Sequence, residues 1–165
     1  SEAHLREAQK EAETLQTLNG SIDTVDSLLH RALEKAGYDM GEDASKAQQD
    51  EAYFKVGLGS TEGYQQVLSE AHLREAQKEA ETLQTLNGAI DSVDSNLHRA
   101  LEKAGYDMGE DASKAQKDEA YFKVGLGNTE GYQEALNEAK ERENKQRPSS
   151  TGPKAGAGIS QPSSP

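Results

Sequence analysis

The sequence contains no cysteine and no tryptophan, and basic residues are scarce beside acidic ones. Without cysteine there is no disulfide framework, no thiolate nucleophile and no cysteine-based zinc site, and the redox compartment stays open. The chain has 30 acidic and 18 basic residues, a formal net charge of −12. Nucleic acids and anionic membrane surfaces bind clusters of Lys and Arg, so this balance argues against both as partners.

Long apolar runs are missing as well. Only 33% of the 165 residues are hydrophobic, and no segment approaches the ~18 consecutive apolar residues typical of a transmembrane helix. We therefore expect no membrane insertion and a thin core. No secretory leader is visible, and the chain begins without Met in the middle of a repeating pattern, which is typical of a piece of a longer protein.

The chain does contain a repeat. The segment SEAHLREAQKEAETLQTLNG opens the sequence and returns unchanged 68 residues later. Aligning the two 68-residue copies leaves seven differences, which are Ser21/Ala89, Thr24/Ser92, Leu28/Asn96, Gln49/Lys117, Ser60/Asn128, Gln66/Glu134 and Val67/Ala135. A third copy starts as NEAKERE and then ends. We expect helical copies at 1–68 and 69–136, the truncated start of a third repeat at 137–147, and a disordered Pro/Gly/Ser-rich tail at 148–165.

Apolar residues in each copy follow a spacing of alternating threes and fours, which we call the seam. In the second copy the seam consists of Leu83, Leu86, Ile90, Val93, Leu97, Ala100 and Ala104. This spacing is typical of helices that pack at a shallow angle, as in coiled coils and bundles. It favours one long helix from Thr61 to Ala104, and the alternative is a break at Asn87-Gly88, with the same choice at Asn19-Gly20 in the first copy.

A second, shorter helix is predicted in each copy, at Asp39–Val56 and Asp107–Val124. Asp39 and Glu42 have the spacing of a capping box, which favours a helix start there. Gly37 is predicted to end the preceding helix in a left-handed conformation, with Tyr38 packing back on Leu33. Gly57 should end the shorter helix. In GLGSTEG, Ser60 or Thr61 can cap the following helix, and Asn128 can do so in the second copy.

Motifs that carry chemistry are weak. GLGSTEG resembles a phosphate-binding loop only in its glycines, because it follows a predicted helix and no P-loop Lys comes after it. His4 with Glu7, and His30 with Glu34, share a helix face but supply too few metal ligands. The carboxylates near Asp39 lack the calcium-loop pattern. We therefore expect no enzyme activity, cofactor or metal.

The eight aromatic residues of the chain are the candidate site residues, and they recur in each copy near the predicted helix junctions. They are Tyr38, Tyr53, Phe54, Tyr64, Tyr106, Tyr121, Phe122 and Tyr132. Aromatic residues in such places either pack the helices and repeats together or form a contact site for a partner. Both interpretations remain open from the sequence.

Together these patterns predict an all-α, elongated tandem helical repeat with coiled-coil-like packing, whose unit has three helices if the chain breaks at Asn-Gly. The expected function is that of a non-enzymatic structural or scaffolding protein with protein partners and possible self-association through the seam. The alternative is a surface-exposed or secreted repetitive antigen, or a host-protein-binding repeat, of a microbe or parasite.

Overall fold

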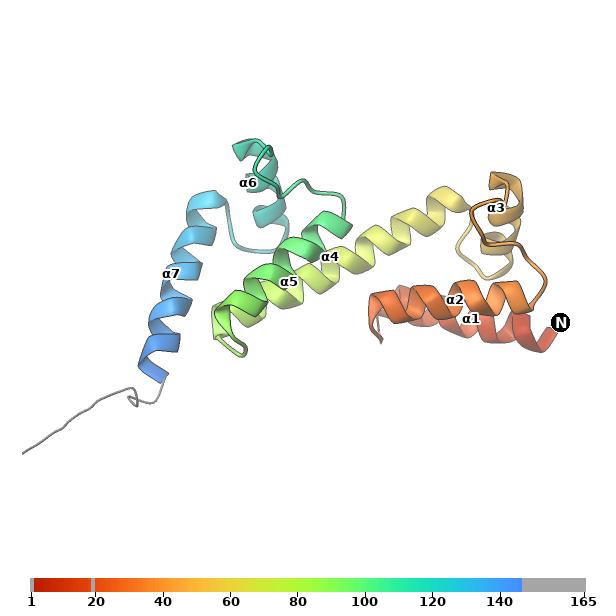
Figure 1. Cartoon of the computed structure of the whole chain (residues 1–165), viewed down its shortest axis with the longest axis horizontal. Coiled ribbons are helices and arrows are strands. Elements are labelled where there is room, and N and C mark those ends of the chain that lie inside the picture. Colours follow the sequence, from red (N-terminus) through yellow and green to blue (C-terminus); the bar gives the residue numbers. More distant parts are fainter. Residues whose placement is uncertain (1, 19, 147–165) are drawn as a thin grey trace, which may run out of the picture. The chain divides into compact units, whose positions relative to one another are not determined.

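The computed structural model describes residues 2–18 and 20–146, and within these ranges the chain is all-α and forms no strand (Figure 1). The helices are α1 (Glu2–Thr17), α2 (Ile22–Lys35), α3 (Lys46–Lys55), α4 (Thr61–Thr85), α5 (Ile90–Lys103), α6 (Lys114–Lys123) and α7 (Thr129–Gln146). The all-α prediction is confirmed. The predicted disordered tail lies outside the described residues.

The helices belong to two compact units. Unit 1 comprises Ser1–Ala76 and Ala100–Asp107, and unit 2 comprises Gln77–Arg99 and Met108–Pro165. Helices α4 and α5 therefore contribute residues to both units.

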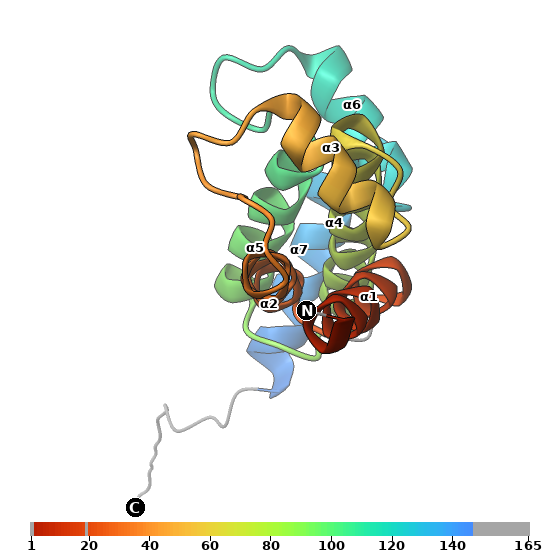
Figure 2. The same ribbon diagram turned by 90° about the vertical axis from the view of Figure 1, so that its right-hand side faces the viewer.

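In unit 1, α1 and α2 pack side by side as a helical hairpin (Figure 2). The buried side of α1 consists of Ala8, Ala12 and Leu15, whose spacing of four and three places them on one helix face. The buried side of α2 consists of Ile22, Val25, Leu29, Ala32 and Leu33. Alanines on α1 let the two backbones approach closely, so a modest amount of apolar surface is enough to close the hairpin.

The prediction of one long helix through Asn87-Gly88 is wrong, and the alternative break is present. Helix α4 ends at Thr85 and α5 begins at Ile90, and Leu86 between them has a left-handed φ of 60°. Leu18 has the same conformation after α1, with a φ of 57°. A single helix would leave its narrow apolar seam uncovered, whereas reversing the chain lets the two halves of the seam bury each other.

The predicted starts of the shorter helices are also wrong. Helix α3 begins at Lys46, with Ser45 as its N-cap, and not at Asp39. The Asp39 carboxylate instead accepts the N–H of Gly41 at 3.0 Å, which makes a local turn. A complete capping box forms later, where the Ser45 hydroxyl accepts the N–H of Gln48 at 3.2 Å and the Ser45 N–H donates to the Gln48 side chain at 2.9 Å.

The second copy differs from its prediction in the same way. Helix α6 begins at Lys114 after the N-cap Ser113, which forms an equivalent capping box with Gln116. The predicted start at Asp107 is therefore wrong, because the side chains of Ser113 and Gln116 together satisfy two backbone N–H groups at the later start.

The predicted helix ends are confirmed. Gly37 follows α2 with a φ of 107°, and the N–H of Tyr38 donates to the Leu33 carbonyl at 3.0 Å. This hydrogen bond, together with one from Gly37 to Glu34 at 3.0 Å, makes a Schellman motif. Gly57 ends α3 with a φ of 88°.

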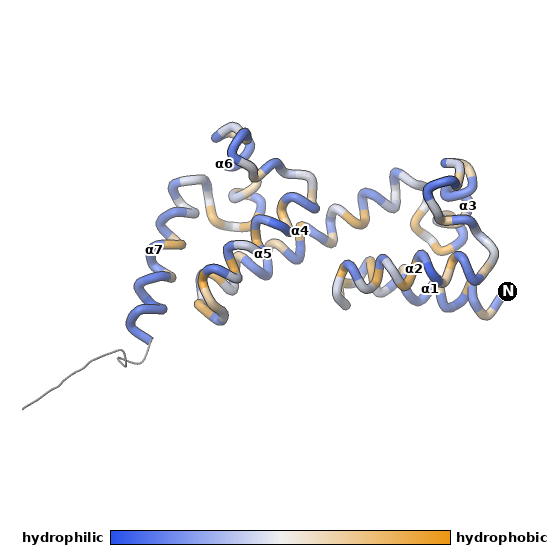
Figure 3. The backbone as a smooth tube through the Cα atoms, in the orientation of Figure 1, coloured by the Kyte–Doolittle hydropathy of each residue, from blue (hydrophilic) through white to orange (hydrophobic). Residues whose placement is uncertain are grey.

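Hydrophilic residues predominate along the helices, with hydrophobic residues at intervals between them (Figure 3). The apolar core of unit 1 is correspondingly narrow and draws on Ala as much as on Leu. None of the helices in the described ranges is long and apolar enough to cross a membrane.

Candidate functional site: the aromatic clusters

Three rings from three helices meet in the core of unit 1. Tyr53 of α3 and Tyr64 of α4 are stacked, with ring centroids 4.3 Å apart and planes 8° from parallel. The ring of His30, from α2, lies 5.7 Å from Tyr64 and 6.4 Å from Tyr53 in a tilted arrangement. Both tyrosines are buried, at 4% and 2% exposure. The cluster therefore holds α2, α3 and α4 together.

The polar atoms of this cluster converge on one nitrogen. His30 Nε2 lies 3.2 Å from the Tyr53 hydroxyl and 3.7 Å from Oδ1 of Asp26. A catalytic relay needs the carboxylate on one ring nitrogen and the reacting group on the other. Here both partners share Nε2, so the geometry does not form a relay.

Burial changes the acidity of both partners of His30. It raises the pKa of Tyr53 to about 12, with a further contribution from the Asp26 charge. Burial also raises the pKa of Asp26, although the neighbouring His30 acts in the opposite direction. At neutral pH the Tyr53 phenol is therefore protonated, and whether it donates to His30 or accepts from it is set by the tautomer of the His30 ring.

Unit 2 contains the same cluster, built from His98 of α5, Tyr121 of α6 and Tyr132 of α7. Tyr121 and Tyr132 are stacked at 4.3 Å and 6°, and His98 Nε2 lies 3.2 Å from the Tyr121 hydroxyl. Burial, together with the charge of Asp94, raises the pKa of Tyr121 to about 12. The cluster is thus a feature of each copy.

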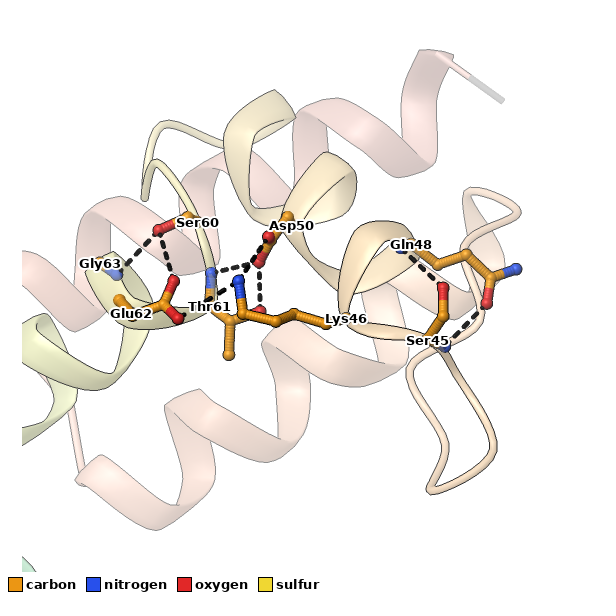
Figure 4. Close-up of polar contacts among 8 residues, drawn as sticks. All are labelled: Ser45, Lys46, Gln48, Asp50, Ser60, Thr61, Glu62 and Gly63. Carbon is orange, nitrogen blue, oxygen red and sulfur yellow. Dashed lines mark hydrogen bonds and ion pairs between the residues drawn. The ribbon is translucent and has the colours of Figure 1, made fainter.

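A polar network at the start of α4 fixes α3 beside the cluster (Figure 4). The Asp50 carboxylate accepts the N–H of Thr61 at 2.6 Å and also the Thr61 hydroxyl. Lys46 bridges Asp50 at 3.0 Å and Glu62 at 3.2 Å. The Thr61 hydrogen bonds, followed by Lys46, lower the pKa of Asp50 to about 2, so this carboxylate is ionised at neutral pH.

The same network recurs in unit 2. Asp118 accepts the N–H of Thr129 at 2.7 Å and pairs with Lys114 at 3.0 Å. Hydrogen bonds from Thr129 lower the pKa of Asp118. Each copy therefore uses one carboxylate to join its short helix to the helix that follows.

The glycine-rich segment GLGSTEG is a helix start. Ser60 caps α4 by accepting the N–H of Gly63 at 3.2 Å, and Asn128 caps α7 in the same way at 2.7 Å. A Cβ on Gly63 would lie 2.3 Å from the Leu58 carbonyl oxygen. Close packing of the turn explains this glycine, and the capping predicted for Ser60 and Asn128 is confirmed.

Phe54 and Phe122 differ from the other candidate residues. Among the residues that the structure describes, they are the large apolar side chains that stay exposed, at 70% and 71%. Each follows a clustered, buried tyrosine by one residue, and one residue turns the chain by about 100° around the helix. Tyr38 and Tyr106 are half-buried. The eight aromatic residues thus fall into a buried set, a half-buried pair and an exposed pair.

Metal ligands do not gather in the part of the chain that the structure describes, where no group of three or more His, Asp or Glu residues could hold an ion. His4 and Glu7 are expected to share a helix face. At the corresponding positions of the second copy, His72 Nδ1 lies 3.7 Å from Oε1 of Glu75. His30 faces Asp26 and not Glu34.

Comparison with known proteins gives no relative. No family model, no curated protein and no solved structure matches this chain. The helices and the two aromatic clusters define an all-α protein.

Proposed function

We propose that the chain is a non-enzymatic scaffolding protein, built as a tandem helical repeat, that acts through protein contacts at Phe54 and Phe122. The observation that carries this proposal is the exposure of both phenylalanines, at 70% and 71%, in corresponding places of the two copies. Aromatic side chains of this size are the usual anchors of protein interfaces. A monomer gains nothing from leaving two of them in water.

The surroundings of the exposed rings define the chemistry of the partner. On a helix, residues three positions apart lie on one face, which places the exposed Glu51 one turn before Phe54, with the exposed Glu119 in the same relation to Phe122. The matching partner surface is an apolar pocket flanked by Lys or Arg. A partner with two such pockets would bind both copies at once and gain affinity by avidity.

The seam supports a repeat whose helices pack within the chain. Leu15 and Leu29 are fully buried in unit 1, and Leu83 and Leu97, their counterparts one copy later, are fully buried as well. Zipper-like pairing between chains through these residues would require both hairpins to open.

Site-specific cross-linking tests the proposal. A photoreactive residue placed at Phe54, and separately at Phe122, should capture the same protein from the source cells. The purified partner should then bind the Phe54→Ser variant at least ~10-fold more weakly than the unmodified chain, and the Phe54→Ser/Phe122→Ser variant more weakly still.

Glu34→Ser is the matched control, because Glu34 is exposed and lies on α2, away from the phenylalanines in sequence. It should leave the affinity unchanged. Since both rings are exposed, melting temperatures should not fall in any of these variants. Unchanged affinity in the double variant, or different captured proteins at the two positions, contradicts the proposal.

A further inference from the structure

The turn between α4 and α5 places an Asn directly before a Gly, at Asn87 and Gly88. Both residues are exposed. The backbone enters this turn through Leu86, whose left-handed φ of 60° is uncommon for a residue that has a side chain. The N–H groups of Leu86 and Asn87 donate to the Thr82 carbonyl, at 2.7 and 3.3 Å. The hydrogen bonds that end α4 therefore stop at the backbone N–H of Asn87.

Two groups of this turn have no hydrogen-bond partner among the residues that the structure describes. They are the side-chain amide of Asn87 and the backbone N–H of Gly88. Gly88 also lacks a Cβ, so no side chain on it hinders the approach of the Asn87 side chain to this nitrogen. The two groups can therefore react with each other without the loss of a hydrogen bond.

A cavity of about 360 Å³ adjoins the turn within unit 2, and Leu86, Asn87, Gly88 and Glu143 are among the residues that line it. This volume gives the Asn87 side chain room to turn and gives water access to it. Across the cavity, Oε2 of Glu143 accepts the N–H of Ile90 in the first turn of α5, at 3.4 Å. The turn thus combines a reactive pair of groups, space for water and one neighbouring carboxylate.

We propose that Asn87-Gly88 is a site of spontaneous covalent modification, at which Asn87 is converted to aspartate and isoaspartate through a cyclic imide. The Gly88 nitrogen attacks Cγ of Asn87 and loses its proton, and the side-chain nitrogen leaves as ammonia. Water then opens the imide ring. Cleavage of the bond from Cγ to nitrogen gives aspartate, whereas cleavage at the backbone carbonyl gives isoaspartate, whose backbone is longer by one methylene. Water is the only co-reactant.

Two other asparagines of unit 2 lack this arrangement. Asn96 lies inside α5, where the nitrogen that would attack belongs to Leu97 and is part of the helix. Asn128 precedes Thr129, whose N–H donates to the Asp118 carboxylate at 2.7 Å. In both places the attacking nitrogen is held, so local opening has to come before the reaction. Modification is therefore expected at the Asn-Gly turn ahead of these two sites.

The two products should differ in their effect on the hairpin of α4 and α5. In the aspartate form, the α5 N-terminus attracts the new carboxylate and Glu143 repels it, so the two effects oppose each other. In the isoaspartate form, the longer backbone disturbs a turn whose fit is close, since a Cβ on Gly88 would lie 3.2 Å from Cγ2 of Val93. The isoaspartate form should therefore melt at a lower temperature than the unmodified chain.

Ageing of the full chain in mildly alkaline buffer tests the inference. Trypsin releases residues 79–99 as one peptide, which contains both Asn87 and Asn96 and differs in mass from its first-copy counterpart because of the substitutions at 89, 92 and 96. Fragmentation of this peptide locates the acid, and methylation by an isoaspartyl methyltransferase identifies isoaspartate. The acid should accumulate at least ~10-fold faster at Asn87 than at Asn96 or Asn128.

The matched control is Asn87→Ser, which cannot form the imide and should keep its melting temperature on ageing, whereas the unmodified chain should lose stability as isoaspartate accumulates. Equal rates at Asn87 and Asn96 overturn the inference. So does a reaction at Asn87 that is at least ~10-fold slower in the folded chain than in urea, because the turn would then protect the side chain. The experiment needs no partner protein and involves neither exposed phenylalanine, so its outcome is independent of the proposed function.

Discussion

Residues 2–17 and 70–85 have the same sequence and both are helical, yet their surroundings differ. Ala71 and His72 are buried in unit 1, whereas Ala3 is exposed and His4 is half-buried. Local sequence therefore sets the helix, and the elements packed against it set which of its residues contribute to stability. The matched positions give each substitution an internal control.

The largest contrast is expected at Ala71 and Ala3. Ala71→Asp places a carboxylate in a fully buried site of the unit 1 core, which should lower the free energy of unfolding by ~3 kcal/mol or more. Ala3→Asp adds the same group to an exposed first turn, where negative charge is favourable, and should change it by less than ~0.5 kcal/mol. Urea unfolding followed by circular dichroism measures both.

Ala71→Val guards against a variant that simply fails to fold. Valine adds two methyl groups in a closed site, which should lower the free energy of unfolding by about 1–3 kcal/mol, a loss between those of Ala3→Asp and Ala71→Asp. Equal effects at positions 71 and 3 would mean that the hairpin does not cover α4.

Much of this contrast could not be predicted from the sequence. Helix ends at Gly37 and the caps at Ser60 and Asn128 were predictable, because they depend on residues close in sequence. The chain reversal at Asn87-Gly88 was not, because a seam of threes and fours fits a straight helix and a hairpin equally well. Whether the seam is covered by its own chain is decided by tertiary packing.

The aromatic clusters show the same limit. The tyrosines were recognisable as candidates from their position, but the approach of His30 to Tyr53 joins residues 23 apart in sequence across the loop between α2 and α3, whose path the pattern does not specify. The start of α3 was misplaced since Asp39 and Ser45 both have capping-box spacing, and the competing turn at Gly41 favours the later one. Long-range contacts therefore account for most of what the pattern left open.

An intermediate contrast is expected for His72 on acidification. Burial lowers the pKa of His72 below its ordinary 6.5, and Lys103 acts in the same direction, whereas Glu75 and Asp23 raise it. The unfolded chain therefore binds more protons than the folded one below pH ~6.5. The stability that His72 contributes is complete above that pH and is lost as the pH falls through 6.5 toward the folded-state pKa.

Melting at pH 7.5 and 5.5 should therefore show a loss of stability that shrinks in His72→Gln and persists in His4→Gln. Asp26, which interacts with His72, has a pKa raised by burial and acts in the opposite direction at lower pH. Subtracting the pH-dependent change in stability of His72→Gln from that of the unmodified chain removes the contribution of Asp26. If His72→Gln and His4→Gln have the same pH dependence, burial of His72 has no energetic consequence.

The smallest contrast concerns Lys103 and Lys35. The Lys103–Asp23 pair is short, at 2.8 Å, but the Asp23 side chain is 74% exposed, so solvent screening should limit its contribution to ~0.5 kcal/mol. Lys103→Glu should lower the free energy of unfolding by about that amount, and adding Asp23→Lys should recover part of the loss. The double-mutant cycle isolates the pairwise coupling, because the effect of Asp23 on the α2 N-terminus cancels in it. Lys35→Glu combined with Asp23→Lys should show no such recovery, because in the described chain Lys35 lies one copy too early to reach Asp23. Loss of the Lys103–Asp23 coupling in 1 M salt would identify an ion pair exposed to solvent. Coupling energies of equal size for Lys103 and Lys35 would contradict the expectation that only Lys103 contacts Asp23.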